Sequence, residues 1–427
     1  MMNQVLIESS KCGCDRQGRP KDLLAWDQAL TMIATQMTAH HPAADLSETI
    51  PCDQALGRVL AQPVITQSMV PSFDHAAMDG YALTTSTLIG NGPWALPIRA
   101  RIAAGQAAPE SLSGASAARI FTGAPVPKGA DAVVMQEDVT RHGDQMLLTR
   151  RPARGLNIRH AGSDMMEGEI ILEKGRRLRS GDIAACAAAG AGCVEVLKRP
   201  RVALLVSGDE LRMAGGVRAA AQIWDVNTPM LLASLAATDA ELVASVQGAD
   251  HRIALAKQMD EMFAMADLVI TTGGISVGEE DHVKPAFIGL GGEMLFSGVA
   301  IKPGKPVSFG RMGRSFWLGL PGNPFSAFVT WQIFGLALIR RLAGETVAVP
   351  ARRHVVTKSA IRRKPGRCEF RPAMLAGFDP WGRDYVQFDD FTPSAGVKNL
   401  VSADGLIILP ADIETLPAGS LVLFQPI

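Results

Sequence analysis

The chain has 427 residues, of which 47% are hydrophobic and 20% are charged, a composition typical of a globular protein with an ample core. Lysine plus arginine and aspartate plus glutamate both number 42, so the formal net charge is zero and nothing favours a nucleic-acid or membrane surface. The N-terminus lacks a signal pattern, and the longest apolar helix candidate, residues 325–339, is too short to span a bilayer. The six cysteines include no pair with zinc-site spacing, so we expect a cytoplasmic protein with reduced thiols.

The N-terminal half is predicted to contain a helical segment that is interrupted by a β-rich insert. Apolar residues recur at helical spacing over residues 22–37, and an alanine-rich helical stretch follows much later, at residues 181–191. Between them, over residues 64–164, short apolar runs alternate with Gly and Pro, which is typical of a small β domain. We therefore predict one discontinuous linking domain, residues 20–63 and 165–198, that carries the insert.

From residue 199 the pattern changes to strands that alternate with helices. Apolar strands are predicted at residues 202–206, 241–246, 267–270 and 316–320. Alternation of this kind predicts a mostly parallel sheet with right-handed crossovers over residues 199–345. Residues 346–427 contain short strands and a basic turn at residues 364–367, which favour a small β-barrel. The predicted fold class is therefore multidomain α/β plus β.

Polar motifs follow the predicted parallel strands, where ligands of such sheets bind. Ser207, Gly208 and Glu210 follow the first strand, and Asp250 follows the second. The third strand is followed by a glycine-rich loop and an acidic cluster that contain Gly273, Gly274, Ser276 and Asp281. Three carboxylates on one rim, Glu210, Asp250 and Asp281, suggest a Mg²⁺ site, whereas each alone is equally well explained as a solvated loop acid.

Two further motifs suit an anion. Lys302 and Lys305 flank Gly304, so both can face one anion, although a solvated basic turn is the simpler alternative. Near the end of the domain, Pro321 and Gly322 precede Asn323, which is expected to cap the helix that Pro324 begins and to leave backbone amides for an anion. These residues together predict a reaction on a phosphorylated small molecule with Mg²⁺.

Seven motifs in a fixed order carry a family resemblance. They occupy residues 73–82 (FDHAAMDGYA), 121–127 (FTGAPVP), 157–159 (NIR), 207–211 (SGDEL), 272–281 (TGGISVGEED), 301–306 (IKPGKP) and 319–327 (GLPGNPFSA). From about residue 22 onward the chain resembles the molybdopterin molybdenumtransferase family, the bacterial relatives of the gephyrin E domain. Each motif is modest alone, but the ordered set is highly specific.

The resemblance implies a four-domain fold and an elongated homodimer, with the active cleft between the α/β domain of one subunit and the β-rich insert of the other. The implied reaction inserts molybdate into adenylylated molybdopterin and releases AMP and molybdenum cofactor, with Mg²⁺ or a similar divalent cation. Other implied partners are the upstream adenylyltransferase and the downstream molybdoenzymes.

The resemblance also implies roles for individual residues. Metal, nucleotide or pterin phosphate would be bound by Glu210, Asp250 and Asp281, and molybdate or phosphate would be neutralised by Lys302 and Lys305. The partner subunit would supply Asp79, Thr122 and Arg159. The pterin would be held by the loops that contain Ser207, Gly208, Gly273, Gly274, Ser276, Pro321, Gly322, Asn323 and Pro324.

The sequence departs from the family pattern at two positions. Ala77 replaces a common serine, and Gly298 stands where the family commonly has a lysine, four residues before Lys302. We hypothesise that the lost charge slows turnover or weakens molybdate binding, and that the Gly298→Lys change would tighten it. Two alternatives remain: a non-catalytic paralogue that binds molybdopterin or cofactor, or a nucleotide pyrophosphatase or adenylyltransferase on the same α/β domain.

Overall fold

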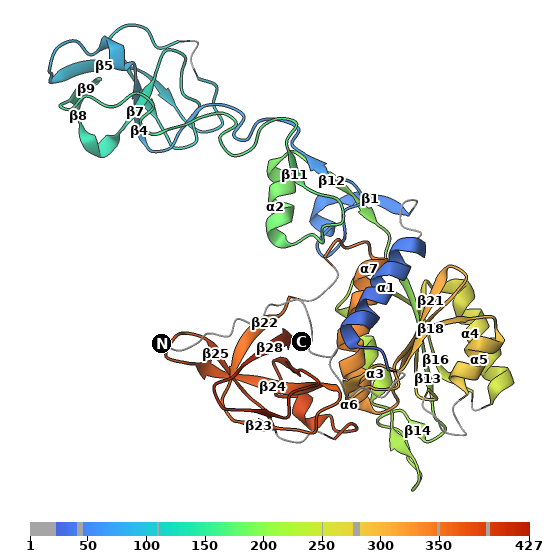
Figure 1. The fold of residues 1–427 in the computed structure, drawn as a ribbon. Helices are drawn as coiled ribbons and strands as arrows, with labels where there is room; N and C mark the ends of the chain where they lie inside the picture. Colours follow the sequence, from blue (N-terminus) through green and yellow to red (C-terminus); the bar gives the residue numbers. More distant parts are fainter. Residues whose placement is uncertain are drawn as a thin grey trace.

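The computed structural model describes residues 23–40, 46–108, 111–249, 251–275, 282–347, 351–389 and 393–427. The chain is elongated, with a β-rich unit at one end and an α/β unit and a barrel together at the other (Figure 1). A narrow segment through which the chain passes twice joins the two ends. The predicted fold class, multidomain α/β plus β, is confirmed, whereas the exact domain boundaries stay a prediction.

The β-rich unit contains a six-stranded sheet in the order β7-β4-β6-β5-β9-β8. Its strands are β4 (Gly80–Leu83), β5 (Trp94–Ile102), β6 (Ala117–Ile120), β7 (Ala132–Met135), β8 (Val139–His142) and β9 (Gln145–Leu148). Neighbouring residues of β4 face opposite cores, with Tyr81 and Leu83 in one and Ala82 in the other. A small pair, β3 (His75–Ala76) with β10 (Ile158–Arg159), lies beside this sheet.

The linking segment is built from both passes of the chain. It contains β1 (Ser47–Pro51) paired with β12 (Cys193–Leu197), β2 (Val64–Ile65) paired with β11 (Ile170–Leu172), and helix α2 (Ser180–Ala188). Ion pairs tie it to the α/β unit: Arg58 and Arg199 lie 3.3 and 3.1 Å from Asp239, and Arg177 lies 2.6 Å from Glu345.

The α/β unit has a six-stranded sheet in the order β16-β13-β17-β21-β20-β18, of which the first four strands are parallel. The strands are β13 (Arg201–Ser207), β16 (Glu241–Gly248), β17 (Leu268–Thr272), β18 (Glu293–Ser297), β20 (Ser308–Met312) and β21 (Ser315–Leu320). The predicted strands and their parallel pairing are confirmed. The runs of β13, β17 and β21 are apolar almost throughout because both faces of the sheet are buried there, whereas the edge strand β16 is largely exposed.

Helices cover both faces of this sheet (Figure 1). One layer consists of α4 (Arg252–Met265) and α5 (Val283–Gly289). The other consists of α1 (Trp26–His40), α3 (Asn227–Ala236) and α6 (Pro324–Thr330), which continues through a π-helical turn, Trp331–Gly335, into α7 (Leu336–Leu342). The buried side chains of α1 thus belong to the α/β core. A short pair, β14 (Leu211–Arg212) with β15 (Ile223–Trp224), projects beyond the sheet.

The C-terminal unit is a closed barrel, as predicted. Its strands are β22 (Arg353–Thr357), β24 (Cys368–Phe378), β25 (Asp384–Gln387), β26 (Gly405–Leu409) and β28 (Leu421–Pro426), and β24 closes it by pairing with β26. The remaining pair is β23 (Ile361–Arg362) with β27 (Thr415–Leu416). Strand β19 (Ile301–Lys302), from the α/β unit, adds to this sheet beside β24. Within the described parts of the chain, no helix has the length and apolarity needed to cross a membrane.

Candidate active site

Three predicted loops meet at the carboxyl ends of the parallel strands. Gly273, after β17, has φ +86°, and a Cβ on it would lie 2.3 Å from the carbonyl oxygen of Ser207, the last residue of β13. A Cβ on Gly322, after β21, would lie 3.4 Å from the Cα of Gly273. Gly208 is the next residue after Ser207. The carbonyl of Gly274, next to Gly273, accepts a 3.3 Å hydrogen bond from the backbone N–H of Val283. Only a glycine at position 273 allows this close approach.

A polar clamp that the sequence analysis missed fastens these loops. The Nδ2 of Asn227 donates to the Oγ1 of Thr272 at 2.9 Å and to the carbonyl of Gly322 at 2.7 Å. The Thr272 hydroxyl donates to the carbonyl of Pro321 at 3.0 Å. Asn227 is buried, and its Oδ1 has no hydrogen-bond partner within the described ranges. The only sequence signal was its place at the start of α3, three residues after β15 ends.

Of the three predicted metal ligands, only Glu210 belongs to the described residues. It is exposed at the same rim of the sheet, three residues after β13 ends. Asp250, Asp281 and the predicted pterin-loop residue Ser276 lie outside the described residues. Among the residues that are described, no three His, Cys, Asp or Glu side chains form a group that could hold a metal ion. The Mg²⁺ prediction therefore stays a prediction.

The loop after β21 differs from expectation in one respect. Asn323 does occupy the position before α6, and Pro324 is the first helical residue, but the Asn323 side chain does not cap the helix. Its Nδ2 instead donates to the Oγ of Ser394 at 3.2 Å, and the backbone N–H of Ser326 donates to the Ser394 carbonyl at 3.3 Å. The C-terminal unit thus covers the start of the helix. Proximity of a distant segment, which the local sequence does not encode, overrides the local cap preference.

The predicted basic turn lies between the α/β unit and the barrel. Lys302 and Lys305 are both exposed, and both line two adjoining cavities. One cavity, of about 470 Å³, is lined by five cationic side chains: Lys302, Lys305, Arg363, Lys364 and Arg367. The other, of about 400 Å³, extends toward α6 and is lined by Phe325, Ser326, Arg371 and Ser394 in addition to the two lysines. We call the two cavities together the basic cleft.

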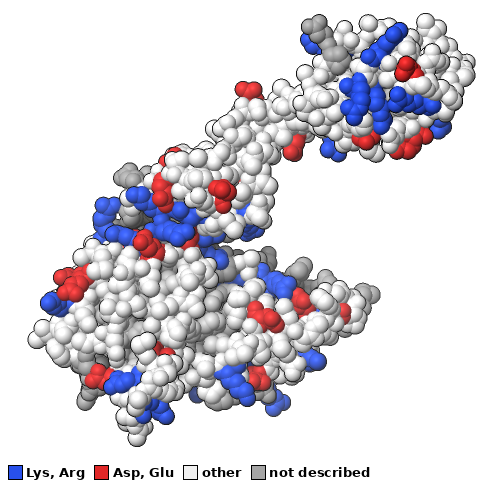
Figure 2. All heavy atoms as spheres, turned by 180° about the vertical axis from the view of Figure 1, so that it is seen from behind, with Lys and Arg blue, Asp and Glu red and all other residues white. Residues whose placement is uncertain are grey.

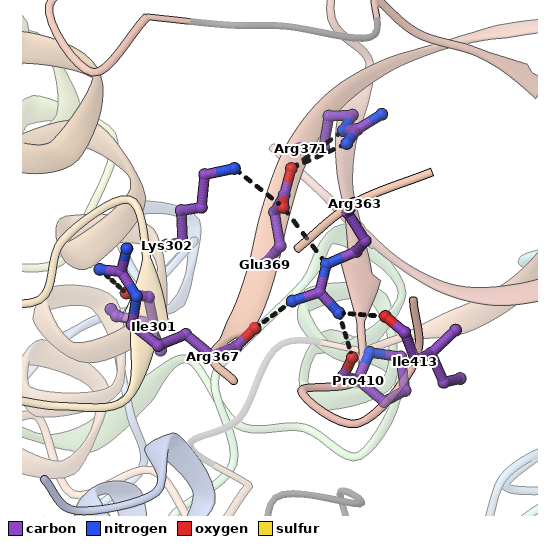
Figure 3. A network of polar contacts seen from close by, with 8 residues as sticks. All are labelled: Ile301, Lys302, Arg363, Arg367, Glu369, Arg371, Pro410 and Ile413. Carbon is purple, nitrogen blue, oxygen red and sulfur yellow. Dashed lines mark hydrogen bonds and ion pairs between the residues drawn. The ribbon is translucent and has the colours of Figure 1, made fainter. Parts of the chain in front are cut away.

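A single buried carboxylate organises the basic cleft (Figure 3). Glu369 lies opposite Lys302 where β19 pairs with β24, and its Oε2 is 3.2 Å from the Lys302 Nζ and 3.3 Å from the Arg363 Nε. Its Oε1 is 2.9 Å from the Nη2 of Arg371. Burial opposes ionisation of Glu369, but Arg371 and Lys302 outweigh it and lower its pKa. One negative charge thus faces several cations, and the cleft keeps an excess of positive charge.

The sequence analysis noted the basic turn at residues 364–367 but did not assign the arginines of the barrel to the site. Besides its bond to Glu369, Arg363 donates to the carbonyls of Pro410, Ile413 and Arg367, and Arg367 donates to the carbonyl of Ile301 at 3.2 Å (Figure 3). A sequence signal existed, because residues 364–367, Lys-Pro-Gly-Arg, nearly repeat residues 302–305, Lys-Pro-Gly-Lys. The two turns line one cavity.

We expect the contribution of Glu369 to stability to depend on pH. Replacing it by glutamine should lower the free energy of unfolding by roughly 3 kcal/mol at neutral pH, because buried cations lose their partner. The folded-state pKa is lowered, so this contribution is present above the ordinary value of 4.5 and is lost as the pH falls through the folded-state pKa. Denaturant unfolding of wild type and Glu369→Gln at several pH values should therefore converge below pH 4.5. The exposed Glu293→Gln is the control, and a pH-independent difference for Glu369→Gln would contradict this account.

The β-rich unit with strands β3 to β10, which we call the distal unit, carries the other predicted residues. Asp79, just before β4, accepts hydrogen bonds from the backbone N–H and the hydroxyl of Thr122, both at 2.8 Å, and these bonds lower the pKa of Asp79. Arg159 is exposed on β10. The linking segment separates all three from the basic cleft, so a single chain does not bring them to Lys302 (Figure 1).

Gly298 has φ +93°, and a Cβ on it would lie 2.8 Å from Leu23, which lines the basic cleft. A lysine here therefore strains the backbone, at about 1–2 kcal/mol, before its charge acts. The hypothesis of a missing charge is best tested by comparing Gly298→Lys with Gly298→Ala, which carries the same strain. We expect both variants to lose stability and the lysine variant to bind molybdate about threefold more tightly than the alanine variant. Equal affinities, measured by calorimetry, would refute a role for this charge.

Three family profiles match consecutive parts of the chain. They are the MoeA N-terminal region (domain I and II) at residues 24–190, a probable molybdopterin binding domain at residues 203–341, and the MoeA C-terminal region (domain IV) at residues 354–427.

Similar proteins span nearly the same length. A molybdopterin molybdenumtransferase of Haemophilus influenzae is 32% identical over 95% of this chain and 98% of its own length. Molybdopterin molybdenumtransferase 2 of Mycobacterium tuberculosis is 32% identical, with 91% and 96% covered. A crystal structure of a molybdopterin biosynthesis moeA protein from Pyrococcus horikoshii OT3 is 27% identical, with a TM-score of 0.79 and 95% of this chain and all of that chain covered. The chain therefore belongs to the molybdopterin molybdenumtransferase (MoeA) family.

Proposed function

We propose that this chain is a molybdopterin molybdenumtransferase, which inserts molybdate into adenylylated molybdopterin and releases AMP and molybdenum cofactor. The observation that carries this proposal is the basic cleft, which adjoins the loop that begins α6 at the rim of the sheet. A cleft with excess positive charge next to strand carboxyl ends suits a small molecule that bears phosphate.

The two exposed lysines are proposed to bind the oxyanion. Molybdate is doubly charged and has to approach a phosphoanhydride, so fixed cations must offset the repulsion between the two anions. Lys302 and Lys305 suit this task because both line both cavities, so one anion can be within reach of the pair. Glu369 holds Lys302 in place through its 3.2 Å ion pair while leaving that lysine exposed.

The pterin is proposed to lie on the loops after β13, β17 and β21, which the buried Asn227 clamp holds together. The residues of these loops that are proposed to contact the pterin are Ser207, Gly208, Gly273, Gly274, Ser276, Pro321, Gly322, Asn323 and Pro324. Glu210, with Asp250 and Asp281, is proposed to hold Mg²⁺ or a similar cation, which prefers carboxylate oxygens and would neutralise phosphate charge.

The site is proposed to be shared between two subunits of a homodimer. Asp79, Thr122 and Arg159 lie on the distal unit and would reach the basic cleft of the other subunit. Thr122 supports this role for Asp79, because its two hydrogen bonds hold the carboxylate ionised and fix its direction.

The test is to mix purified protein with adenylylated molybdopterin, Mg²⁺ and molybdate, and to follow AMP release together with reconstitution of an apo-molybdoenzyme. We expect AMP release that depends on molybdate and yields active cofactor. Tight pterin binding with neither product would instead favour a non-catalytic paralogue. AMP release from adenylylated molybdopterin without any need for molybdate would favour the pyrophosphatase alternative.

A further inference from the structure

One end of the sheet in the distal unit brings together residues that are far apart in the sequence. Strand β4 begins at this end, directly after Asp79. Its antiparallel neighbours β6 and β7 stop there, and so does β5, which is parallel to β6. The loop after β6 carries Phe121 and Thr122. The Asp79–Thr122 pair therefore has β5 and β6 side chains as its neighbours.

Two arginines lie at this end of the sheet and contact the same aromatic ring. Arg101 and Arg119 are direct neighbours across β5 and β6. Their Cζ atoms lie 4.7 and 4.8 Å from the centroid of the Phe121 ring, and Arg119 also lies 5.1 Å from the ring of Tyr81. Contact with a ring face restrains a guanidinium and leaves its in-plane N–H groups available to an anion.

Neither arginine forms an ion pair within the described parts of the chain, although the charge of Arg119 helps to lower the pKa of the nearby Asp79 carboxyl. Arg119 donates to two neutral oxygens, the carbonyl of Gly80 at 3.1 Å and the Oε1 of Gln136 at 2.5 Å. Arg101 is exposed and has only its ring contact there. More broadly, lysine and arginine side chains gather on one face of the distal unit (Figure 2).

We propose that Arg101 and Arg119, held against Phe121, bind a phosphate group of the substrate that the α/β unit of the other subunit presents. This inference rests on the proposed function and adds two binding residues to it. The ligand class follows from the chemistry, because two adjacent planar donors match phosphate oxygens. The same end of the sheet carries the carboxylates of Asp79 and Glu137. A phosphate can approach these carboxylates only if cations offset the repulsion between the negative charges.

The arginine at position 101 gives the cleaner test, because Arg119 also supports the fold through Gly80 and Gln136. We expect Arg101→Gln to weaken the binding of adenylylated molybdopterin about tenfold, the size of one lost charge-assisted hydrogen bond, and Arg101→Lys to restore part of it. The Phe121→Leu change, which removes the ring but keeps both charges, should weaken binding by roughly threefold, because the guanidiniums are less restrained. The affinity for molybdate should not change.

Arg141→Gln is the matched control, because Arg141 is an exposed arginine of the same unit. It lies on β8, the edge strand that is separated from β5 by β9. Binding is measured by calorimetry on the intact protein without molybdate, and turnover is measured separately. If wild type turns over while Arg101→Gln binds the substrate as tightly as Arg141→Gln, the phosphate role is refuted and the proposed function stands. If wild type does not turn over, the binding measurement still decides the role of the arginines.

Discussion

Lys302→Ala is expected to lower kcat/KM for molybdate about 10- to 100-fold, since a charge-assisted contact to an oxyanion contributes roughly 1.5–3 kcal/mol. Lys305→Ala should have a comparable effect, because both lysines line both cavities of the basic cleft. Part of the lost activity of Lys302→Ala has a second cause. Without Lys302, the negative charge of Glu369 is balanced by Arg363 and Arg371 alone, so the cleft becomes less positive.

The measurement is the rate of AMP release as a function of molybdate concentration. Lys257→Ala serves as the control, because Lys257 is exposed on α4 and its ion pair with Glu261 is exposed as well. Lys302→Arg should recover part of the activity, since it keeps the charge but changes the donor geometry. Wild-type kinetics for Lys302→Ala and Lys305→Ala together would exclude the basic cleft as the molybdate site.

Mixing two strongly impaired variants is expected to restore activity, because the proposed site takes residues from two subunits. Asp79→Ala removes the contribution of the distal unit, and Lys302→Ala removes that of the basic cleft. In a mixed dimer, one of the two sites contains both native residues. Random pairing of equal amounts therefore predicts roughly a quarter of the wild-type rate, if the dimer has two-fold symmetry.

The control is a mixture of Asp79→Ala with Thr122→Ala. These residues are hydrogen-bonded to one another within one chain, so every site of a mixed dimer lacks one of them or has its pair broken. Activity should return in the first mixture and not in the second. The shared site would be ruled out if neither mixture regains activity after subunit exchange has been verified. It would also be ruled out if sedimentation analysis shows that the protein is a monomer.

The sequence predicted the parallel part of the sheet well because periodicity and burial coincide there. The strands β13, β17 and β21 are apolar on both faces, so their runs stand out, and their residues alternate between the two cores that flank the sheet. Motif order also located the loops of Ser207, Gly273 and Gly322, which the structure brings together. These features depend on residues close in sequence.

The missed features depend on contacts between distant segments. Strand β19 is only two residues long, and it pairs with β24 of the barrel, which sets Lys302 opposite Glu369. Asn323 gives its side chain to Ser394 instead of its own helix. Leu24 pairs with Val299, and α1 then packs into the α/β core, although its sequence shows only that one face is apolar.

The sequence by itself determined the fold class, the family and the loops that form the rim of the sheet, because hydrophobic periodicity and ordered motifs are local properties. Only the tertiary structure decided that Arg363, Arg367, Glu369 and Arg371 join the predicted lysines in one cleft. It also decided that Arg101 and Arg119 lie beside Asp79 and Thr122 in the β-rich unit, which the sequence had predicted as a separate insert. A local pattern specifies which face of an element is buried, but the partner of that face is selected by the packing of the whole chain.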